Sequence, residues 1–327
     1  WGLVLFAWWL LSRLLYRVVD VRPVPQPLRH ALGALVVVAL VSFAAAMFRG
    51  QPADQVSPAI SALVRLASWA GVVLVTIDGV RTIAEVKRIA RSLAIAGGLL
   101  AALGLAQSIL HKTLLDFYGA LPGLSYSSEG VTDRGDFARA MGTATHPLEF
   151  AVSLIGLLPI AFGAAVTRGF HDDFGATPTG STRQRLMWWV PAVLIMVTSM
   201  IAVSRSAIIG LLFAVVASMF FLPTVYRWVV GVLGAIAAVA ISVLVPGMLT
   251  TVLYLFLSAS SDPSTQSRTD ALANVPEFLS ASPVFGVGFG TFLPRYYIFD
   301  NQLVLLVVEL GVLGIIVGVL FVIPLGS

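Results

Sequence analysis

The sequence predicts an all-α protein, a bundle of membrane-spanning helices with two long loops on its outer face. Of its 327 residues, 58% are hydrophobic and only 11% are charged, whereas soluble domains carry about 25% charged residues. A single soluble core cannot bury so much apolar surface, because the surface of a folded chain does not shrink without limit. The apolar residues also gather in long runs, which we expect lipid to cover.

About nine of these runs approach the length of about 20 apolar residues that a spanning helix needs. They cover residues 1–15, 31–48, 59–79, 92–110, 147–167, 187–203, 207–222, 228–248 and 301–323. Backbone polar groups inside hydrocarbon must pair within their own segment, so helices are expected for all of them. We therefore expect a single transmembrane domain over residues 1–327, and, because the chain begins at Trp1 inside an apolar run, a fragment of a longer membrane protein.

The basic residues predict the orientation, because cytoplasmic loops of membrane proteins carry an excess of Lys and Arg. One set of alternate connections holds twelve of the 20 Lys and Arg residues: Arg13, Arg17, Arg22, Arg29, Arg81, Lys87, Arg88, Arg91, Arg168, Arg183, Arg185 and Arg227. The opposite set holds seven: Arg49, Lys112, Arg134, Arg139, Arg205, Arg268 and Arg295. The first set is predicted to be cytoplasmic. The two longest loops, 111–146 and 249–300, then face outside and are expected to form the active site.

Several function classes are excluded or disfavoured by composition. The chain has no Cys, which excludes disulfides and thiolate metal sites. The formal net charge of +4 is small, and the basic residues are sorted by loop, so no nucleic-acid partner is expected. The sequence contains no Walker A loop for ATP hydrolysis. His171, Asp172 and Asp173 lie in a predicted cytoplasmic loop and are interpreted as solvated.

The first outer loop offers Arg134, Arg139 and His146 as candidate substrate-binding residues. Pro147 suits the first turn of a helix, so His146 is expected at the helix mouth. The alternative is that the two arginines anchor the membrane interface and that His146 is an ordinary solvated residue. Arg205, between two apolar runs, either snorkels to the interface or binds phosphate, because an arginine near the membrane needs water, phosphate or a partner.

The second outer loop carries the strongest candidates. Arg268 lies in a segment whose apolar residues share one helical face, which suits a helix along the membrane surface, and Pro276 is expected to kink or restart that helix. Gly286, Gly288 and Gly290 resemble a nucleotide-binding fingerprint only superficially, because no βαβ unit surrounds them. We interpret these glycines as a backbone turn that must approach something closely. The loop ends at Asp300 and Asn301.

Glu309 lies further along the last run, on nearly the same face as Gln302. A carboxylate at this depth is expected to face the interior of the bundle. It either pairs structurally, with Arg65 or with a Ser or Thr hydroxyl, or it has a functional role; the sequence leaves both open.

The order of these features resembles the O-antigen ligase and O-antigen polymerase superfamily, over residues of about 90–323. The motifs that carry the resemblance are Arg139, Gly142 and His146-Pro147 before a helix; Ser204-Arg205-Ser206; Ser267-Arg268; Pro283 to Gly290; and Asp300-Asn301 to Gly314. The resemblance implies a GT-C-like fold in the bacterial cytoplasmic membrane. It implies a glycan donor joined through a diphosphate to undecaprenyl lipid, bound by outer-face arginines, and a sugar hydroxyl as acceptor. Ligases of this family have a His where this chain has Asp300, which shifts the expectation toward a polymerase or a different acceptor.

The chemistry of the residues leads to a similar hypothesis. Arg205, Arg268 and Arg139 suit the stabilisation of a diphosphate leaving group, because a guanidinium matches the geometry of phosphate oxygens. Asp300 is the preferred candidate for a base, and His146 is the second. No cofactor and no metal are expected, since the donor is already activated and no acidic cluster is predicted to face outside. A transporter or flippase of lipid-linked sugars, and a scaffold among envelope-assembly proteins, remain alternatives.

Overall fold

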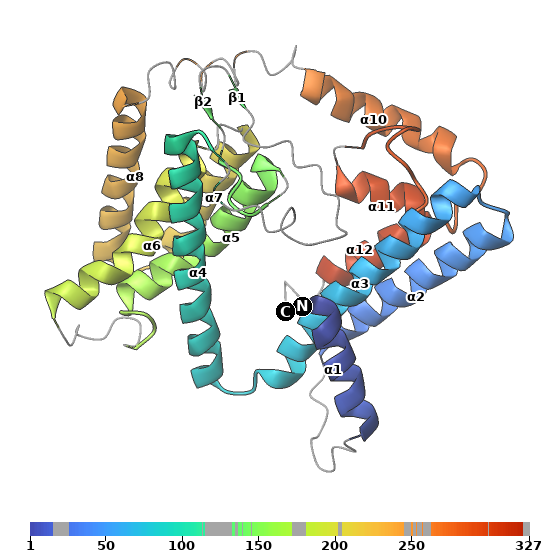
Figure 1. Cartoon of the computed structure of the whole chain (residues 1–327), viewed down its shortest axis with the longest axis horizontal. Coiled ribbons are helices and arrows are strands. Elements are labelled where there is room, and N and C mark those ends of the chain that lie inside the picture. Colours follow the sequence, from blue (N-terminus) through green and yellow to red (C-terminus); the bar gives the residue numbers. More distant parts are fainter. Residues whose placement is uncertain are drawn as a thin grey trace. The chain divides into compact units, whose positions relative to one another are not determined.

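The computed structural model confirms the all-α class. It describes residues 1–15, 26–112, 114, 133–134, 137–138, 140–144, 146–171, 181–201, 205–244, 250, 253, 257, 263–299 and 301–322. Over these residues, the only strands are β1 (Asp133–Arg134) and β2 (Phe137–Ala138), which pair antiparallel. All other regular elements described are helices (Figure 1). The contacts divide the chain into two compact units, residues 1–81 with 259–327, and residues 82–258.

The first unit is built around three N-terminal helices and three C-terminal ones. They are α1 (Gly2–Leu15), α2 (Pro27–Phe48), α3 (Ala53–Gly79), α10 (Pro263–Leu279), α11 (Gln302–Leu310) and α12 (Val312–Val322). Helix α3 packs against α1 and α2, and α2 also contacts α11 and α12. Helix α10 packs against α11. Segments from the two ends of the sequence therefore form one body.

The second unit has its core between α5 and the helices around it. Its helices are α4 (Ile83–Leu110), α5 (Pro147–Val166), α6 (Thr182–Ile201), α7 (Arg205–Phe221) and α8 (Thr224–Leu244). Helix α5 packs against α4, α6 and α7. Its buried Phe150, Leu154, Leu158 and Phe162 meet Ile195 of α6 in one apolar cluster.

The helices have the length and surface expected of membrane spans. Helices α2 to α6 are each long and apolar enough to cross a membrane. Helices α1, α7 and α12 are apolar but shorter, with 14, 17 and 11 residues, and α8 is apolar over Thr224–Ile236. Large apolar side chains such as Phe220 and Trp228 are more than 70% exposed, which is costly in water but not in lipid. The chain is a multi-pass membrane protein.

Two sequence expectations differ from the structure. The run 301–323 was expected as one helix, but it is divided at Gly311 into α11 and α12. Helix α10 does not restart at Pro276, because it continues through Pro276 to Leu279; a kink there stays a prediction. Pro276 stands in the last turn, where the loss of one backbone hydrogen bond interrupts little. That the chain forms a single transmembrane domain stays a prediction.

Candidate functional site

The loop before α11 pairs with the backbone groups that lose their helical partners at the break at Gly311. In a continuous helix, the N–H groups of residues 312 and 313 would donate to the carbonyls of residues 308 and 309. Here all four groups pair with residues 283–288 instead. The bonds are Val312 N to Pro283 O at 3.0 Å, Leu313 N to Val284 O at 3.4 Å, Val287 N to Val308 O at 3.0 Å and Gly288 N to Glu309 O at 3.2 Å. The break therefore leaves none of these four groups without a partner, as burial in a membrane protein requires.

The three glycines of this loop have the close contacts that the sequence analysis expected. Their φ angles are +70°, +130° and +72° at Gly286, Gly288 and Gly290, a region that disfavours other residues. A Cβ at Gly286 would lie 2.3 Å from the Glu309 carbonyl oxygen. One at Gly288 would lie 2.4 Å from the Ala46 Cβ. The interpretation as a tight turn is confirmed, and the groups it approaches are α11, α2 and α3. Substrate binding by these glycines stays a prediction.

Glu309 is buried, with 5% of its surface exposed. The backbone N–H groups of Gly290 and Phe292 donate hydrogen bonds to its carboxylate, and the positive charge of Arg65 acts on it. The Ser42 hydroxyl donates to its carbonyl at 2.7 Å and accepts from the Phe289 N–H at 3.0 Å. Glu309 thus joins α11 and α2 to the glycine loop, which comprises residues 283–290. The carboxylate is thus held by backbone N–H groups rather than by the predicted hydroxyl: Ser42 bonds the backbone carbonyl of Glu309, and Arg65 acts on the carboxylate through its charge.

Polar residues at the end of α2 and in the first turn of α3 also bind this loop and the residues after it. Arg49 donates to the carbonyls of Gly286 and Val287 at 2.9 and 3.1 Å. Gln55 donates to the Tyr296 hydroxyl. Arg295 donates to the same hydroxyl at 2.7 Å and pairs with the Asp54 carboxylate. These two hydrogen bonds raise the pKa of Arg295 above its ordinary value.

An aromatic cluster joins α10 to the end of this loop. The ring of Phe278 on α10 meets Phe292 edge-on, with centroids 4.9 Å apart, and also contacts Tyr297 and Phe299. Phe292 in turn contacts Tyr296. Edge-to-face pairs of this kind stabilise packing beyond the area they bury. The predicted apolar face of α10 therefore packs in part on the loop, while Leu272 on α10 is 61% exposed.

Three further candidates belong to this unit. Asn301 caps α11, because its side-chain oxygen accepts from the Leu303 N–H at 3.0 Å. Asp300 lies outside the described residues, and Arg268 is described only as a backbone position in the second turn of α10. The structure brings Gly286, Gly288, Gly290 and Glu309 into direct contact and fixes the start of α11 at Asn301.

The second unit holds the other candidates. His146 caps α5: its Nδ1 accepts from the Leu148 N–H at 3.1 Å, and Pro147 occupies the first turn as expected. Since Nδ1 is an acceptor here, a neutral His146 carries its proton on Nε2. Arg205 is the first residue of α7, and Arg134 lies in β1; neither side chain is described. Arg139 lies outside the described residues.

The end of the first outer loop is fastened to α4 by a residue that the sequence analysis missed. The buried Gln107 donates to the Gly142 carbonyl at 2.8 Å and accepts from the Gly142 N–H at 2.7 Å. Ser42 was missed as well. Ser42 stands alone among apolar residues within α2, and Gln107 lies beside Ser108 at the end of the apolar run of α4; a polar residue in such a run usually has a partner. That signal was present in the sequence.

Comparison with known proteins gives a family match over part of the chain. Residues 190–319 match the family model described as O-antigen ligase. The matched segment contains every candidate site residue except Arg134, Arg139 and His146. No curated protein and no solved structure gave a match. This match supports the resemblance found in the sequence: over residues 190–319, the chain is similar to the O-antigen ligase family.

Proposed function

We propose that this protein moves a glycan from an undecaprenyl-diphosphate carrier to a sugar hydroxyl at the outer face of the bacterial cytoplasmic membrane. The reaction is that of an O-antigen or exopolysaccharide polymerase or ligase. The observation that carries the proposal is the family match, whose range includes Arg205, Arg268 and the whole glycine loop. Asp300 in the position of the ligases' His favours polymerisation or a different acceptor.

Arg205, Arg268 and Arg139 stabilise the diphosphate as the glycosidic bond breaks. The leaving diphosphate gains negative charge, and fixed guanidinium groups lower the free energy of that state. Arg205 begins a helix of 17 residues, so the partial positive charge of a helix N-terminus acts in the same direction. Arg134 and His146 belong to the predicted rim on the side of the first outer loop, where a neutral His146 can donate a hydrogen bond from Nε2.

Asp300 accepts the proton of the attacking hydroxyl in this proposal. It directly precedes Asn301, whose cap fixes the first turn of α11. In this proposal, the glycine loop positions Asp300 by supporting the outer end of α11. Ser42, Arg49 and Glu309 hold this loop. A base contributes about 10²–10⁴-fold to a rate, so loss of Asp300 is expected to reduce turnover without abolishing donor binding.

A transporter of lipid-linked sugars was the alternative, and the break at Gly311 is the feature that bears on it. Broken helices in transporters expose backbone groups that bind substrate or ions. Here the carbonyls of Val308 and Glu309 and the N–H groups of Val312 and Leu313 pair with the loop 283–288. The break therefore has a structural explanation, and the glycosyltransferase is favoured.

The test replaces Arg205 and Arg268 by Ala, one at a time. Arg183→Ala is the matched control, because Arg183 is an exposed arginine in the first turn of α6, on the predicted cytoplasmic side. We expect glycan transfer to fall on the order of 10²–10³-fold in both site variants, as for loss of a group that stabilises transition-state charge, and to stay unchanged in the control. Unchanged glycan length and linkage in both variants, with the proteins stably inserted, would refute the proposal.

A further inference from the structure

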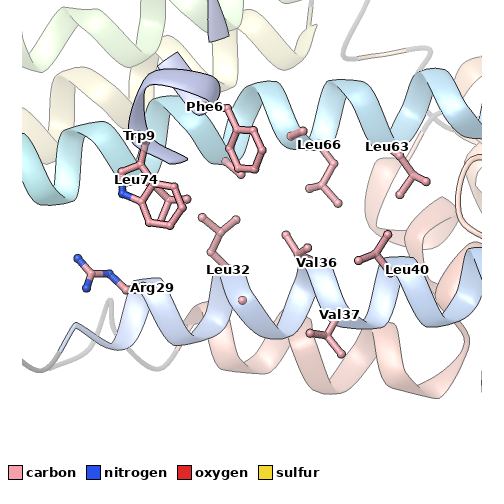
Figure 2. Close-up of a pocket in the computed structure, with 13 residues that line it drawn as sticks. Phe6, Trp9, Arg29, Leu32, Val36, Val37, Leu40, Leu63, Leu66 and Leu74 are labelled. Carbon is pink, nitrogen blue, oxygen red and sulfur yellow. The ribbon is translucent and has the colours of Figure 1, made fainter. Parts of the chain in front are cut away.

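An apolar groove lies in the first unit, at the other end of α2 and α3 from the glycine loop. Its volume is about 450 Å³, within the usual range for small-molecule sites. Figure 2 shows side chains of α2 and α3 pointing toward one another across it, with Phe6 and Trp9 of α1 at one end. The lining residues are Phe6, Trp9, Arg29, Leu32, Gly33, Val36, Val37, Leu40, Leu63, Leu66, Ala67, Ala70 and Leu74. Arg29 is the one charged residue in this lining.

Among the residues that the structure describes, the groove ends at a cluster with surplus positive charge. The Asp78 carboxylate accepts hydrogen bonds from Trp9 Nε1 and, at 2.7 Å, from Arg13, and it pairs with Arg29. Arg81 donates to the Asp78 backbone carbonyl. One carboxylate thus faces more than one guanidinium. The buried Nε–H of Arg29 has no hydrogen-bond partner within the described part of the chain.

The length of the groove indicates what fits it. Arg29 and Leu40 are eleven residues apart on α2, hence about 16 Å along the axis at 1.5 Å per residue. The hydrocarbon of one leaflet is about 15 Å thick, half of a core of about 30 Å. Arg29 stands in the first turn of α2 and Asp78 in the last turn of α3, so the charged cluster is at the membrane interface. The groove therefore spans one leaflet from headgroup to bilayer centre.

We propose that this groove binds an anionic glycerophospholipid of the inner leaflet, with one acyl chain between α1, α2 and α3 and its phosphate on Arg29. The surplus guanidinium charge complements the phosphate, and the Arg29 side chain, 33% exposed, remains accessible to it. Basic pockets between helices on the cytoplasmic side are typical sites for anionic lipid headgroups, and the positive-inside rule predicts this end of α2 and α3 to be cytoplasmic. A polyprenyl carrier, several times longer than one leaflet, fits the groove less well.

One structural detail provides a selective test. A Cβ added at Gly33, in the groove wall, meets no atom within 4 Å. Gly33→Leu is therefore expected to place its longer side chain in the groove, and it replaces a glycine in a helix interior, where glycine is unfavourable. Gly156 on α5 is also open and exposed, so Gly156→Leu is the matched control. Arg29→Gln removes the phosphate partner and leaves Asp78 paired with Arg13. Arg183→Gln is its control for charge.

The experiment labels the full-length protein in phosphatidylcholine nanodiscs with a photoactivatable phosphatidylglycerol. We expect cross-links on residues 32–40 and 63–74, competed by phosphatidylglycerol and not by added phosphatidylcholine. Gly33→Leu should reduce labelling on the order of fivefold, because the new side chain displaces the acyl chain from its contacts. Arg29→Gln should reduce it about fivefold, the usual effect of one basic residue near an anionic lipid. Both control variants should label like the wild type.

Three results would overturn the proposal. Equal competition by phosphatidylcholine would show that the groove does not select an anionic headgroup. Undiminished labelling of Gly33→Leu would show that the chain lies elsewhere. Stronger competition by undecaprenyl phosphate than by phosphatidylglycerol would show that the occupant is a carrier lipid. None of these results depends on glycan transfer, so the lipid site and the proposed reaction are tested separately.

Discussion

Replacing Ser42 by Ala should weaken the junction between α2, α11 and the glycine loop. The Ser42 hydroxyl is fully buried and takes part in two hydrogen bonds, to the Glu309 carbonyl and from the Phe289 N–H. The carbonyl keeps its bond from Gly288, whereas the Phe289 N–H loses the partner described for it. One hydrogen bond in a membrane protein contributes about 0.6 kcal/mol on average, so the loss of two should lower the free energy of unfolding by at least about 1 kcal/mol. If the Phe289 N–H stays buried without a partner, the free energy of unfolding should fall by at most about 3 kcal/mol.

The assay is equilibrium unfolding of the purified chain in mixed micelles, with Ser218→Ala as the control. Ser218 is also buried, but its hydroxyl donates to the Ala214 carbonyl one turn back in the same helix. Such a bond adds little, because that carbonyl also accepts the helical N–H. We expect Ser42→Ala to lose about 1–3 kcal/mol and the control less than about 0.5 kcal/mol. Equal losses in the two variants would refute the reasoning.

Three further predictions concern Gly311, Asn301 and Gln107. Gly311→Ala should destabilise the protein by more than about 2 kcal/mol in the same unfolding assay, because φ is +64° and the Cβ would lie 2.5 Å from the Val284 carbonyl oxygen. Gly318→Ala, inside α12 and with no atom within 4 Å of its Cβ, should not destabilise it and should raise stability by up to about 1 kcal/mol. Asn301→Ala should cost about 1 kcal/mol through loss of the cap of α11, and Asn301→Asp should retain it; equal melting of the two variants would contradict this. Gln107→Leu should speed hydrogen exchange at the Gly142 amide about tenfold, measured by mass spectrometry, and an unchanged rate would show that Gln107 does not hold the loop.

Much of the fold could be predicted from the sequence because membrane helices depend on local composition. A long apolar run needs no information from distant residues to form a helix, and helices α2 to α6 lie where such runs were found. The His146-Pro147 start of α5 is also local, since a cap acts within one turn. The glycine turn was expected because alternating glycines in a short loop indicate unusual backbone angles.

The break at Gly311 could not be predicted from the run itself. Its partners come from residues 283–288, so the exchange of hydrogen bonds depends on a register between separate segments. The run 301–323 is apolar enough for an unbroken helix, and its other glycines, Gly314 and Gly318, lie inside α12 without interrupting it. Local propensity does not distinguish Gly311 from these two. The positions of the Arg205 and Arg268 side chains likewise depend on long-range packing rather than on local sequence.

The most direct test of the proposed reaction is reconstitution of the protein in liposomes with a lipid-diphosphate oligosaccharide as donor, followed by analysis of the products. We expect new glycosidic bonds with release of the undecaprenyl diphosphate. A ladder of lengths would identify a polymerase, the reaction that Asp300 favours, and a single transfer to an added acceptor would identify a ligase. Donor that crosses the bilayer intact, with no glycan transferred in the presence of acceptor, would contradict the proposed transferase and identify a transporter.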